Sequence, residues 1–162
     1  MAPSAMRSLG GVTPAPSTEK WELYDRYQRE WHDGKQAGDL VGFLQFLYQS
    51  PVPSLEFEYR DPGLAGEDAP AGQGRLLGIG LCDLTPTALS SVYFYFDPRE
   101  ERRSLGTFSA LYELQWAKDN TRSHWYAGYW VPGARTMAYK ARFQPAELLG
   151  ADGIWRPLTP HP

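Results

Sequence analysis

The chain has 162 residues, of which 42% are hydrophobic and 14% aromatic, and its formal net charge at pH 7 is -3. This length suits one domain that buries about 70% of the surface its unfolded chain exposes. Because the overall charge supplies no attractive field for a nucleic acid, such a partner would have to be bound by a local basic patch.

Cysteine content and hydropathy exclude further classes of protein. Cys82 is the single cysteine, which excludes an intramolecular disulfide and a cysteine-only zinc or iron–sulfur site, so we expect no metal. A reducing, cytoplasmic setting fits this cysteine usage. A membrane helix needs about 18 or more consecutive apolar residues. The sequence has no such stretch, so we expect no membrane partner.

Two helices are predicted after an N-terminal stretch without periodicity. Residues 1–16 are rich in Ala, Pro, Ser and Gly, and we expect a disordered tail. From Ser17 or Thr18 to Trp31, aromatic residues recur at three- to four-residue steps, which indicates a helix with a core-facing stripe. Asp39 is the expected cap of a second helix that ends near Ser50.

Strands dominate the middle of the chain. Residues 55–60 alternate apolar and charged side chains, which predicts a half-exposed strand, and residues 75–84 form the next strand. The nearly continuous apolar run at 89–96 is typical of a central strand covered on both faces. A helix at 107–120, a strand at 125–131 and a short helix at 133–139 are expected to follow. This order indicates an α/β or α+β layered domain.

Four segments together resemble a known family. They are YDRYQREWH with Tyr24, Tyr27 and His32, LSSVYFYFDP at 89–98, SLGTFSALYE at 104–113, and GYWVPGARTMAYKARF at 128–143. In this combination the chain resembles the C-terminal domain of the aminoacyl-tRNA-protein transferases, which attach arginine or leucine to protein N-termini. The resemblance spans about Tyr24 to Trp155.

The resemblance implies a fold and a donor. The expected fold is an acetyltransferase-like (GNAT-like) layered mixed sheet with helices on both faces, a single domain over 17–162, whose fourth strand splays from the fifth and opens a cleft for the acyl donor. At the start of the next helix, Gly106 would let backbone amides approach a ligand, and a helix N-terminus favours a phosphate or carboxylate. Coenzyme-A users carry a glycine-richer turn there, so we expect aminoacyl-tRNA as donor substrate and no cofactor.

The implied activity is the transfer of leucine or arginine from aminoacyl-tRNA to proteins with N-terminal Asp or Glu, which marks them for degradation (N-degron). The MAYKARF form is closer to bacterial leucyl members, whereas elements at 27–28 and 50–51 resemble the arginyl branch, so the donor stays open. The alternatives are a non-catalytic module that recognises acidic N-termini and a coenzyme-A-dependent N-acyltransferase. Members of the family also carry a cysteine-bearing N-terminal domain, so the expectation is a standalone domain or a separate partner chain that supplies it.

The chemistry requires a neutral amine to attack an activated ester, for which positioning can do most of the work. A general base would add about 10²- to 10⁴-fold. Backbone N–H groups or a tyrosine hydroxyl could stabilise the oxyanion. The candidate catalytic residues are His32, Asp83 and Asp97 as bases and Tyr93 as oxyanion donor. Taken alone, His32 indicates a helix C-terminus, and Asp97 followed by proline indicates a turn.

Substrate binding is expected to depend on cations. Arginine and lysine suit an acidic acceptor N-terminus, and the predicted substrate-binding residues are Ser90, Ser91, Gly106, Tyr129, Arg135, Tyr139, Lys140 and Arg142. Thr136 stands where the family has a lysine, which removes one cation. Arg99, Arg102 and Arg103 are the expected contacts for tRNA phosphates, with aromatic side chains stacking the terminal adenine. As a mixed-charge loop, the same arginines also fit an ordinary solvated surface.

Overall fold

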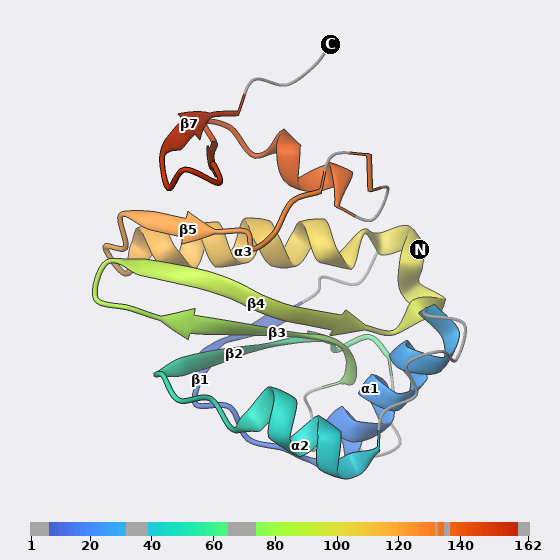
Figure 1. The fold of residues 1–162 in the computed structure, drawn as a ribbon. Coiled ribbons are helices and arrows are strands. Elements are labelled where there is room, and N and C mark those ends of the chain that lie inside the picture. The colour runs from blue at the N-terminus through green and yellow to red at the C-terminus, as the bar shows by residue number, and fades with distance from the viewer. Residues whose placement is uncertain (1–6, 32–38, 65–73, 132, 135–136, 159–162) are drawn as a thin grey trace. The chain divides into compact units, whose positions relative to one another are not determined.

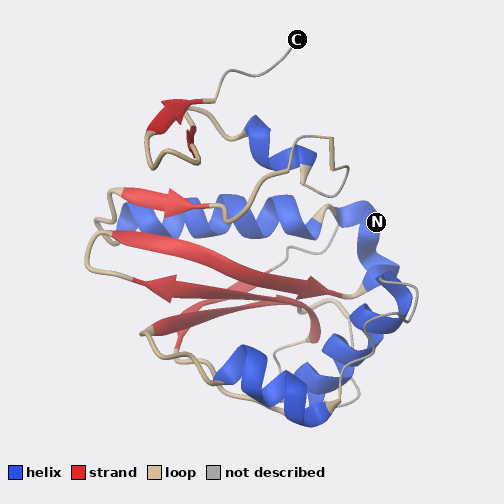
Figure 2. Cartoon of the chain, in the orientation of Figure 1, coloured by secondary structure: helices blue, strands red, loops and turns tan. Residues whose placement is uncertain are grey.

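A computed structural model of the chain describes residues 7–31, 39–64, 74–131, 133–134 and 137–158. By its internal contacts the chain divides into two compact units, Met1–Tyr126 and Ala127–Pro162. The first unit holds the main sheet and three α-helices, and the second holds short elements only (Figures 1 and 2).

The first unit is built on a five-stranded mixed sheet with the order β1-β2-β3-β4-β5. Its strands are β1 (Arg7–Val12), β2 (Ser54–Asp61), β3 (Arg75–Leu84), β4 (Ala88–Phe96) and β5 (His124–Tyr126). Neighbours from β1 to β4 are antiparallel, whereas β5 runs parallel to β4. The strands expected at 55–60, 75–84 and 89–96 are thereby confirmed within one residue at each end.

Strand β1 corrects the expectation that residues 1–16 form a disordered tail. Its residues pair antiparallel with β2, for example Leu9 with Glu58. The segment lacks apolar periodicity, but pairing on a free sheet edge satisfies backbone N–H and C=O groups whatever the side chains are. The first six residues lie outside the described part of the chain.

The most deeply buried strand is β3, not β4 as the apolar run at 89–96 suggested. Seven consecutive residues of β3, Leu76 to Cys82, are buried. Strand β4 has half-buried positions along most of its length, and its Val92 is 52% exposed. Because β5 is only three residues long, it leaves most of one side of β4 unpaired.

Helices cover both faces of the sheet, as expected for the layered acetyltransferase-like class. Helices α1 (Thr18–Trp31) and α2 (Leu40–Tyr48) pack on one face, where Leu23, Phe43 and Ile79 share a buried cluster. Helix α3 (Leu105–Asp119) packs on the other face, where Ala117 joins a buried cluster with residues of β2, β3 and β4. A 3-10 helix, η1 (Pro98–Arg103), links β4 to α3.

The second unit contains the 3-10 helix η2 (Ala138–Arg142) and a hairpin of β6 (Glu147–Leu149) and β7 (Trp155–Pro157). The strand expected at 125–131 ends at Tyr126, because Gly128 has a φ of +74° that interrupts extended backbone. Where a short helix was expected at 133–139, the structure has the 3-10 helix η2 at Ala138–Arg142, which overlaps the expected range only at residues 138–139. No helix among the described residues has both the length and the apolar character to cross a membrane.

Candidate functional site at the open side of β4

The candidate site lies where β4 parts from β5. Strand β5 pairs only with the start of β4, through Ala88–His124, Leu89–Trp125 and Ser90–Tyr126 (Figure 1). From Ser91 onward, no strand in the described part of the chain pairs with this side of β4. An unpaired strand edge presents backbone N–H and C=O groups that can bind a ligand. Strands β4 and β5 therefore part after Ser90.

A β-bulge lies directly beyond the last β4–β5 pair. On the β3 side, Leu81 pairs with Tyr93 and Cys82 pairs with Ser91, which leaves Val92 without a partner. A bulge leaves one residue outside the ladder and is common next to active sites. Backbone N–H groups in such a place can stabilise a developing oxyanion.

A buried carboxylate, Glu113 of α3, lies on the α3 face of this same region. Its side chain is 1% exposed. Oε1 accepts a hydrogen bond from Ser109 Oγ at 2.9 Å, and Oε2 accepts one from Trp125 Nε1 at 2.9 Å. Burial raises the pKa of Glu113, while hydrogen bonds from Trp125, Ser109, Ser91 and Cys82 act in the opposite direction.

The sheet makes room for this carboxylate at Gly80 of β3. A Cβ atom at Gly80 would lie 3.1 Å from Ser109 Oγ and 3.2 Å from Glu113 Oε1, so a larger residue would displace both groups. Ser109 Oγ also lies 3.0 Å from the Tyr59 hydroxyl. Because Ser109 has one proton and an ionised carboxylate only accepts, Tyr59 is the donor to Ser109 when Glu113 is charged.

Sequence reasoning missed this cluster, although it left a signal. Ser109 and Glu113 lie at helical spacing from the apolar residues Leu105, Tyr112 and Trp116. A carboxylate and a hydroxyl within the apolar stripe of a helix predict a buried polar pair. Trp125, which donates to Glu113, belongs to β5, and chain order alone does not show where β5 lies in the sheet.

On the opposite face of the sheet, Tyr93 of β4 packs against α1 and α2. Its hydroxyl accepts a hydrogen bond from Gln28 Nε2 at 2.9 Å, and its ring makes an edge contact with Phe46. Burial raises the pKa of Tyr93, so the hydroxyl is protonated at neutral pH. The Tyr93 hydroxyl is therefore hydrogen-bonded to a residue of α1.

Asp97, at the end of β4, is held by arginines. It is fully buried, and its carboxylate lies 2.8 Å from Arg99 Nε, 2.6 Å from Arg99 Nη2 and 3.4 Å from Arg26 Nη1. Burial acts to raise the pKa of Asp97, but the hydrogen bonds and charge of Arg99, with the charge of Arg26, lower it overall. Its side chain also accepts from the Arg99 amide and so caps η1. An ionised, structural carboxylate fits these contacts.

Of the other two base candidates, the structure describes Asp83 alone. Asp83 pairs in register with Ser90 across β3 and β4. Its carboxylate accepts a hydrogen bond from Ser54 Oγ at 3.0 Å. His32 lies outside the described residues.

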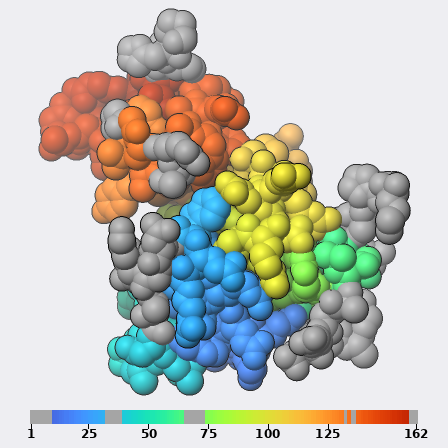
Figure 3. All heavy atoms as spheres, turned by 90° about the vertical axis from the view of Figure 1, so that its right-hand side faces the viewer, coloured from blue at the N-terminus to red at the C-terminus, as the bar shows by residue number. Residues whose placement is uncertain are grey.

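The arginines expected to contact tRNA differ in their partners. Arg99 is bound to Asp97, and Arg103 donates to the buried carboxylate of Asp61 at 2.7 Å. Arg102 is exposed and forms no ion pair within the described residues. The η1 segment lies beside α1, and Figure 3 turns these two elements toward the viewer, α1 in blue and η1 in yellow.

Helix α3 begins without a side-chain cap. Ser104 at its N-cap has a φ of 52° and makes no capping hydrogen bond from its side chain, and the first turn holds no acidic residue. Gly106 in that turn is half-buried. The first amides of α3 therefore lack the acceptor that Ser, Thr, Asp or Asn caps supply.

The remaining predicted binding residues belong to the second unit. Tyr129 is 90% exposed, and its backbone carbonyl accepts a hydrogen bond from Lys140 Nζ at 2.8 Å. Tyr139 makes an edge contact with Phe143, with ring centroids 6.2 Å apart. Arg142 is exposed, and Arg135 lies outside the described residues. Within the unit, η2 and the Lys140–Tyr129 contact hold Tyr129, Tyr139 and Lys140 in one segment.

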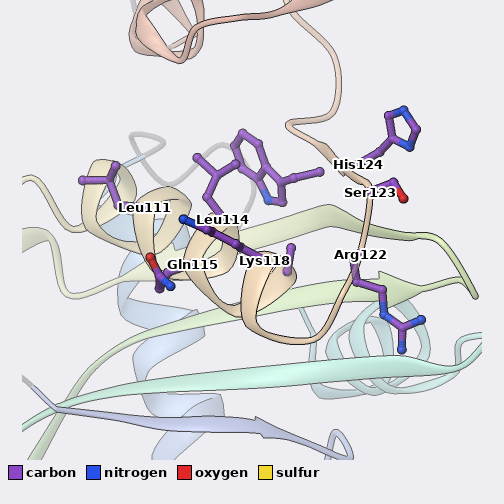
Figure 4. A pocket seen from close by; sticks show the side chains of 9 residues that line it. Leu111, Leu114, Gln115, Lys118, Arg122, Ser123 and His124 are labelled. Atoms are coloured by element: carbon purple, nitrogen blue, oxygen red, sulfur yellow. The ribbon is translucent and has the colours of Figure 1, made fainter.

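A surface pocket of about 480 Å³ lies between α3 and the segment that leads into β5, and Trp125, the donor to Glu113, is one of the residues that line it. Figure 4 shows Leu114 and Lys118 of α3 there, while the side chains of Arg122 and His124 point in different directions. None of the predicted site residues lines it. No three His, Cys, Asp or Glu side chains among the described residues are placed to hold a metal ion.

Comparison with known proteins gives a family match over most of the chain. Residues 19–150 match the family described as "Arginine-tRNA-protein transferase, C terminus". Three relatives carry the name aspartate/glutamate leucyltransferase. The protein of Brucella suis is 36% identical over 151 residues, which cover 91% of this chain and 61% of the relative. That of Paramagnetospirillum magneticum is 35% identical over 162 residues, covering 95% and 62%, and that of Acinetobacter baylyi is 40% identical over 149 residues, covering 91% and 51%. The chain thus spans less than two thirds of these relatives.

Proposed function

Because the chain belongs to the family of arginine-tRNA-protein transferase C-terminal domains, we propose that it transfers an amino acid from aminoacyl-tRNA to the N-terminal amine of a protein. The observation that carries the proposal is the open side of β4, where a bulge at Val92 leaves backbone groups unpaired directly beyond the last pair with β5. An acyl ester bound along this edge would meet N–H donors at its carbonyl oxygen.

Leucine is the proposed donor amino acid and N-terminal Asp or Glu the proposed acceptor. The relatives with 35–40% identity are named for this reaction, whereas the family description names arginine. In this proposal the modified protein enters an N-degron pathway of the cytoplasm.

The reaction places few demands on the protein beyond positioning. The ester is already activated, so alignment of the amine and the carbonyl carbon supplies much of the rate enhancement. Oxyanion stabilisation falls to the backbone near Ser91 and Val92, because the Tyr93 hydroxyl is bound by Gln28 on the other face. His32 and Asp83 remain base candidates, while Asp97 is held as an ion-paired carboxylate.

Cations of the chain suit the two charged substrates. Lys140 and Arg142, with Arg135, would pair with the acidic acceptor side chain. Tyr129 and Tyr139 would supply aromatic contacts beside them. On the other unit, exposed Arg102 is the arginine of the η1 cluster most available to a tRNA phosphate. The uncapped amide N–H groups around Gly106 can donate hydrogen bonds to another anion.

The test uses peptides that begin with Asp, Glu or Ala, each incubated with the chain and leucyl-tRNA, arginyl-tRNA or acetyl-coenzyme A. Mass spectrometry of the peptide N-terminus is the readout. The proposal predicts addition of leucine to the Asp and Glu peptides and none to the Ala peptide. Addition of an acetyl group instead would establish a coenzyme-A-dependent acyltransferase. Binding of Asp and Glu peptides with no mass gain from any donor would establish a recognition module.

A further inference from the structure

On the basis of the proposed aminoacyl transfer, we propose that the pocket between α3 and β5 binds a nucleotide at the single-stranded 3′ end of tRNA. Lys118 contacts the phosphate of this nucleotide, and the base packs against the apolar and aromatic side chains of the pocket. The pocket has a volume of about 480 Å³, and sites for small ligands range from about 300 to 1,000 Å³.

Two segments of the first unit form the walls of this pocket. One wall is a single face of α3, on which Leu111, Leu114, Gln115 and Lys118 recur at helical spacing. The other wall is the segment of residues 122–125, which leads into β5 (Figure 4). A ligand in the pocket would therefore contact a helix on one side and the start of an edge strand on the other.

Hydrogen bonds hold the second wall against α3. The Arg122 amide donates to the carbonyl oxygen of Ala117 at 2.8 Å. The indole N–H of Trp125 donates to the buried carboxylate of Glu113 at 2.9 Å. Because both contacts exist within the fold itself, the pocket is formed before a ligand arrives, which lowers the entropy cost of binding.

The charge of the pocket favours an anion. Its ionisable side chains are Lys118, Arg122 and His124, and among the described residues no carboxylate lines it. Lys118 and Arg122 form no ion pair in the part of the chain that the structure describes. By contrast, Lys20 and Arg60 of the same unit bind carboxylates. The charge of Lys118 is therefore available to a ligand.

The cations of the pocket suit a phosphate better than a carboxylate. A guanidinium binds a carboxylate through a fork of two parallel N–H donors, whereas a lysine ammonium acts as a point charge and commonly binds phosphate. Arg122 Nη1 donates to the carbonyl oxygen of Pro86, and its Nε is buried. Its fork is thus engaged in the fold, and exposed Lys118 is left as the main anion contact. This difference favours a nucleotide over the acidic N-terminus of a protein.

Aromatic side chains beside these cations provide surfaces for a base. Trp125 is half-buried and lines the pocket. His124 is exposed, and its ring stacks on that of Tyr126 with centroids 6.2 Å apart and planes 14° apart. Leu111 on the opposite wall is 54% exposed. Proteins bind the unstacked bases of single-stranded RNA through such a combination of flat rings and cations.

The pocket lies near the edge proposed for the acyl end of the donor. His124 and Trp125 pair with the first two residues of β4, and the two strands part after the pair of Ser90 with Tyr126. Two residues of a strand span about 7 Å. A nucleotide bound at His124 would therefore lie close to the open side of β4, as expected for a nucleotide at the acylated 3′ end.

The experiment measures filter binding of two uncharged RNAs, an intact tRNA and the same tRNA without its three 3′-terminal nucleotides, over about 0.05–0.3 M salt. It compares wild type with Lys118→Met and His124→Ala, which change exposed side chains of the pocket. The control is Arg29→Met, which removes an exposed cation of α1 that is paired with Asp25. Circular dichroism establishes that each variant is folded.

Lys118→Met should weaken binding of the intact tRNA about fivefold at 0.1 M salt and lower the slope of log K against log salt by about 0.7, because one phosphate contact is lost. His124→Ala should weaken it about fivefold through the loss of a stacking surface. Binding of the shortened tRNA by both variants should stay within about twofold of wild type. Arg29→Met should stay within about twofold of wild type with both RNAs.

Several results would overturn the nucleotide site. They are equal losses with both tRNAs, no loss with either, and weaker binding of an Asp peptide to Lys118→Met while tRNA binding is unchanged. The last would assign the pocket to the acceptor protein. A transfer assay with wild type separates the site from the proposed function. Transfer without the expected binding pattern would overturn the site alone, whereas the expected binding pattern without transfer would support the site and contradict the proposed function.

Discussion

Replacing Lys20 of α1 with methionine should destabilise the first unit strongly, because the buried carboxylate of Glu56 and the half-buried carboxylate of Glu58 are both paired with its charge. Lys20 forms ion pairs with Glu56 and with Glu58 Oε1, the latter at 3.0 Å. The side chains are 7% exposed for Lys20, 0% for Glu56 and 13% for Glu58. A Met side chain fills similar space, so the change removes the charge and keeps most of the packing.

The magnitude follows from the burial of the partners. Removing one member of a buried ion pair costs about 3–5 kcal/mol, because the remaining charge is buried without compensation. For a chain of this size, 1 kcal/mol corresponds to about 2–4 °C in Tm, so we expect a fall of about 6–20 °C. The matched control is Lys118→Met, at an exposed position of α3, which should change the free energy of unfolding by no more than about 0.5 kcal/mol.

The pH dependence has a definite sign. Burial raises the pKa of Glu56, while the hydrogen bond and charge of Lys20 lower it, so the loss of Lys20 raises it further. A carboxyl with a raised folded-state pKa stabilises the fold at low pH, and that stability is lost as pH rises above the ordinary pKa of 4.5. The stability gap between wild type and Lys20→Met should therefore be largest near pH 7 and shrink toward pH 5.

Urea unfolding followed by circular dichroism at pH 5 and pH 7 measures these differences, and a second substitution tests their cause. The double variant Lys20→Met, Glu56→Gln should be more stable than Lys20→Met alone, because it no longer buries an unpaired charge at position 56. Two results would show that the unpaired charge of Glu56 does not destabilise Lys20→Met. One is a double variant that is less stable than Lys20→Met, and the other is a stability difference between wild type and Lys20→Met that does not change with pH.

Four further substitutions test other parts of the structure. Arg103→Ala should lower the free energy of unfolding in urea by about 3 kcal/mol, because it leaves the buried carboxylate of Asp61 without its arginine. Arg102→Ala should keep that free energy within about 0.5 kcal/mol of wild type and should weaken tRNA binding in a filter assay. Asp97→Asn should lower the free energy of unfolding by about 1.5–3 kcal/mol at pH 7. Because the folded-state pKa of Asp97 is lowered, its contribution is present above the ordinary pKa of 3.8 and is lost as pH falls through the lower folded-state value. The stabilities of wild type and variant should therefore converge as pH falls below about 4. Trp125→Phe should cost about 1.5–3 kcal/mol in urea unfolding, since the buried carboxylate of Glu113 loses a hydrogen-bond donor.

Local periodicity predicted most of the main sheet and its helices. The alternation at 55–60 and the helical stripe ending at Trp31 are confirmed within one residue by β2 and α1. The cap at Asp39 is confirmed as well, since its carboxylate accepts from the Gly42 amide. These signals are local, because they depend on which face of one element is buried.

Non-local features were not predictable in the same way. Pairing of Arg7–Val12 with β2 uses backbone groups and leaves no side-chain pattern to recognise. The apolar run at 89–96 reflects rings packed on both faces of β4, and it does not report that one edge is open beyond Ser90. The partners of Arg99 and Arg103 likewise appear only in the fold, where two of the arginines expected for tRNA bind buried carboxylates.

The candidate site combines both kinds of information. The resemblance indicated Ser90, Ser91 and Gly106, and the structure places the two serines where β4 parts from β5 and Gly106 in the first turn of α3. Glu113 and Trp125 became apparent only when α3 and β5 were placed on β4. Their interaction depends on the parallel pairing of β4 with β5, which joins residues more than 30 positions apart. Chain order alone does not determine this pairing.

Binding of the acyl donor along the open side of β4 can be tested by backbone hydrogen exchange of the chain with and without a leucyl-tRNA whose ester is replaced by an unreactive amide. We expect the amides of residues 91–96 and of the first turn of α3 to become protected, because the acyl end binds along the open side of β4. Unacylated tRNA should protect the η1 region without residues 91–96. Unchanged exchange at residues 91–96 with the bound acyl analogue would show that the acyl end does not bind there.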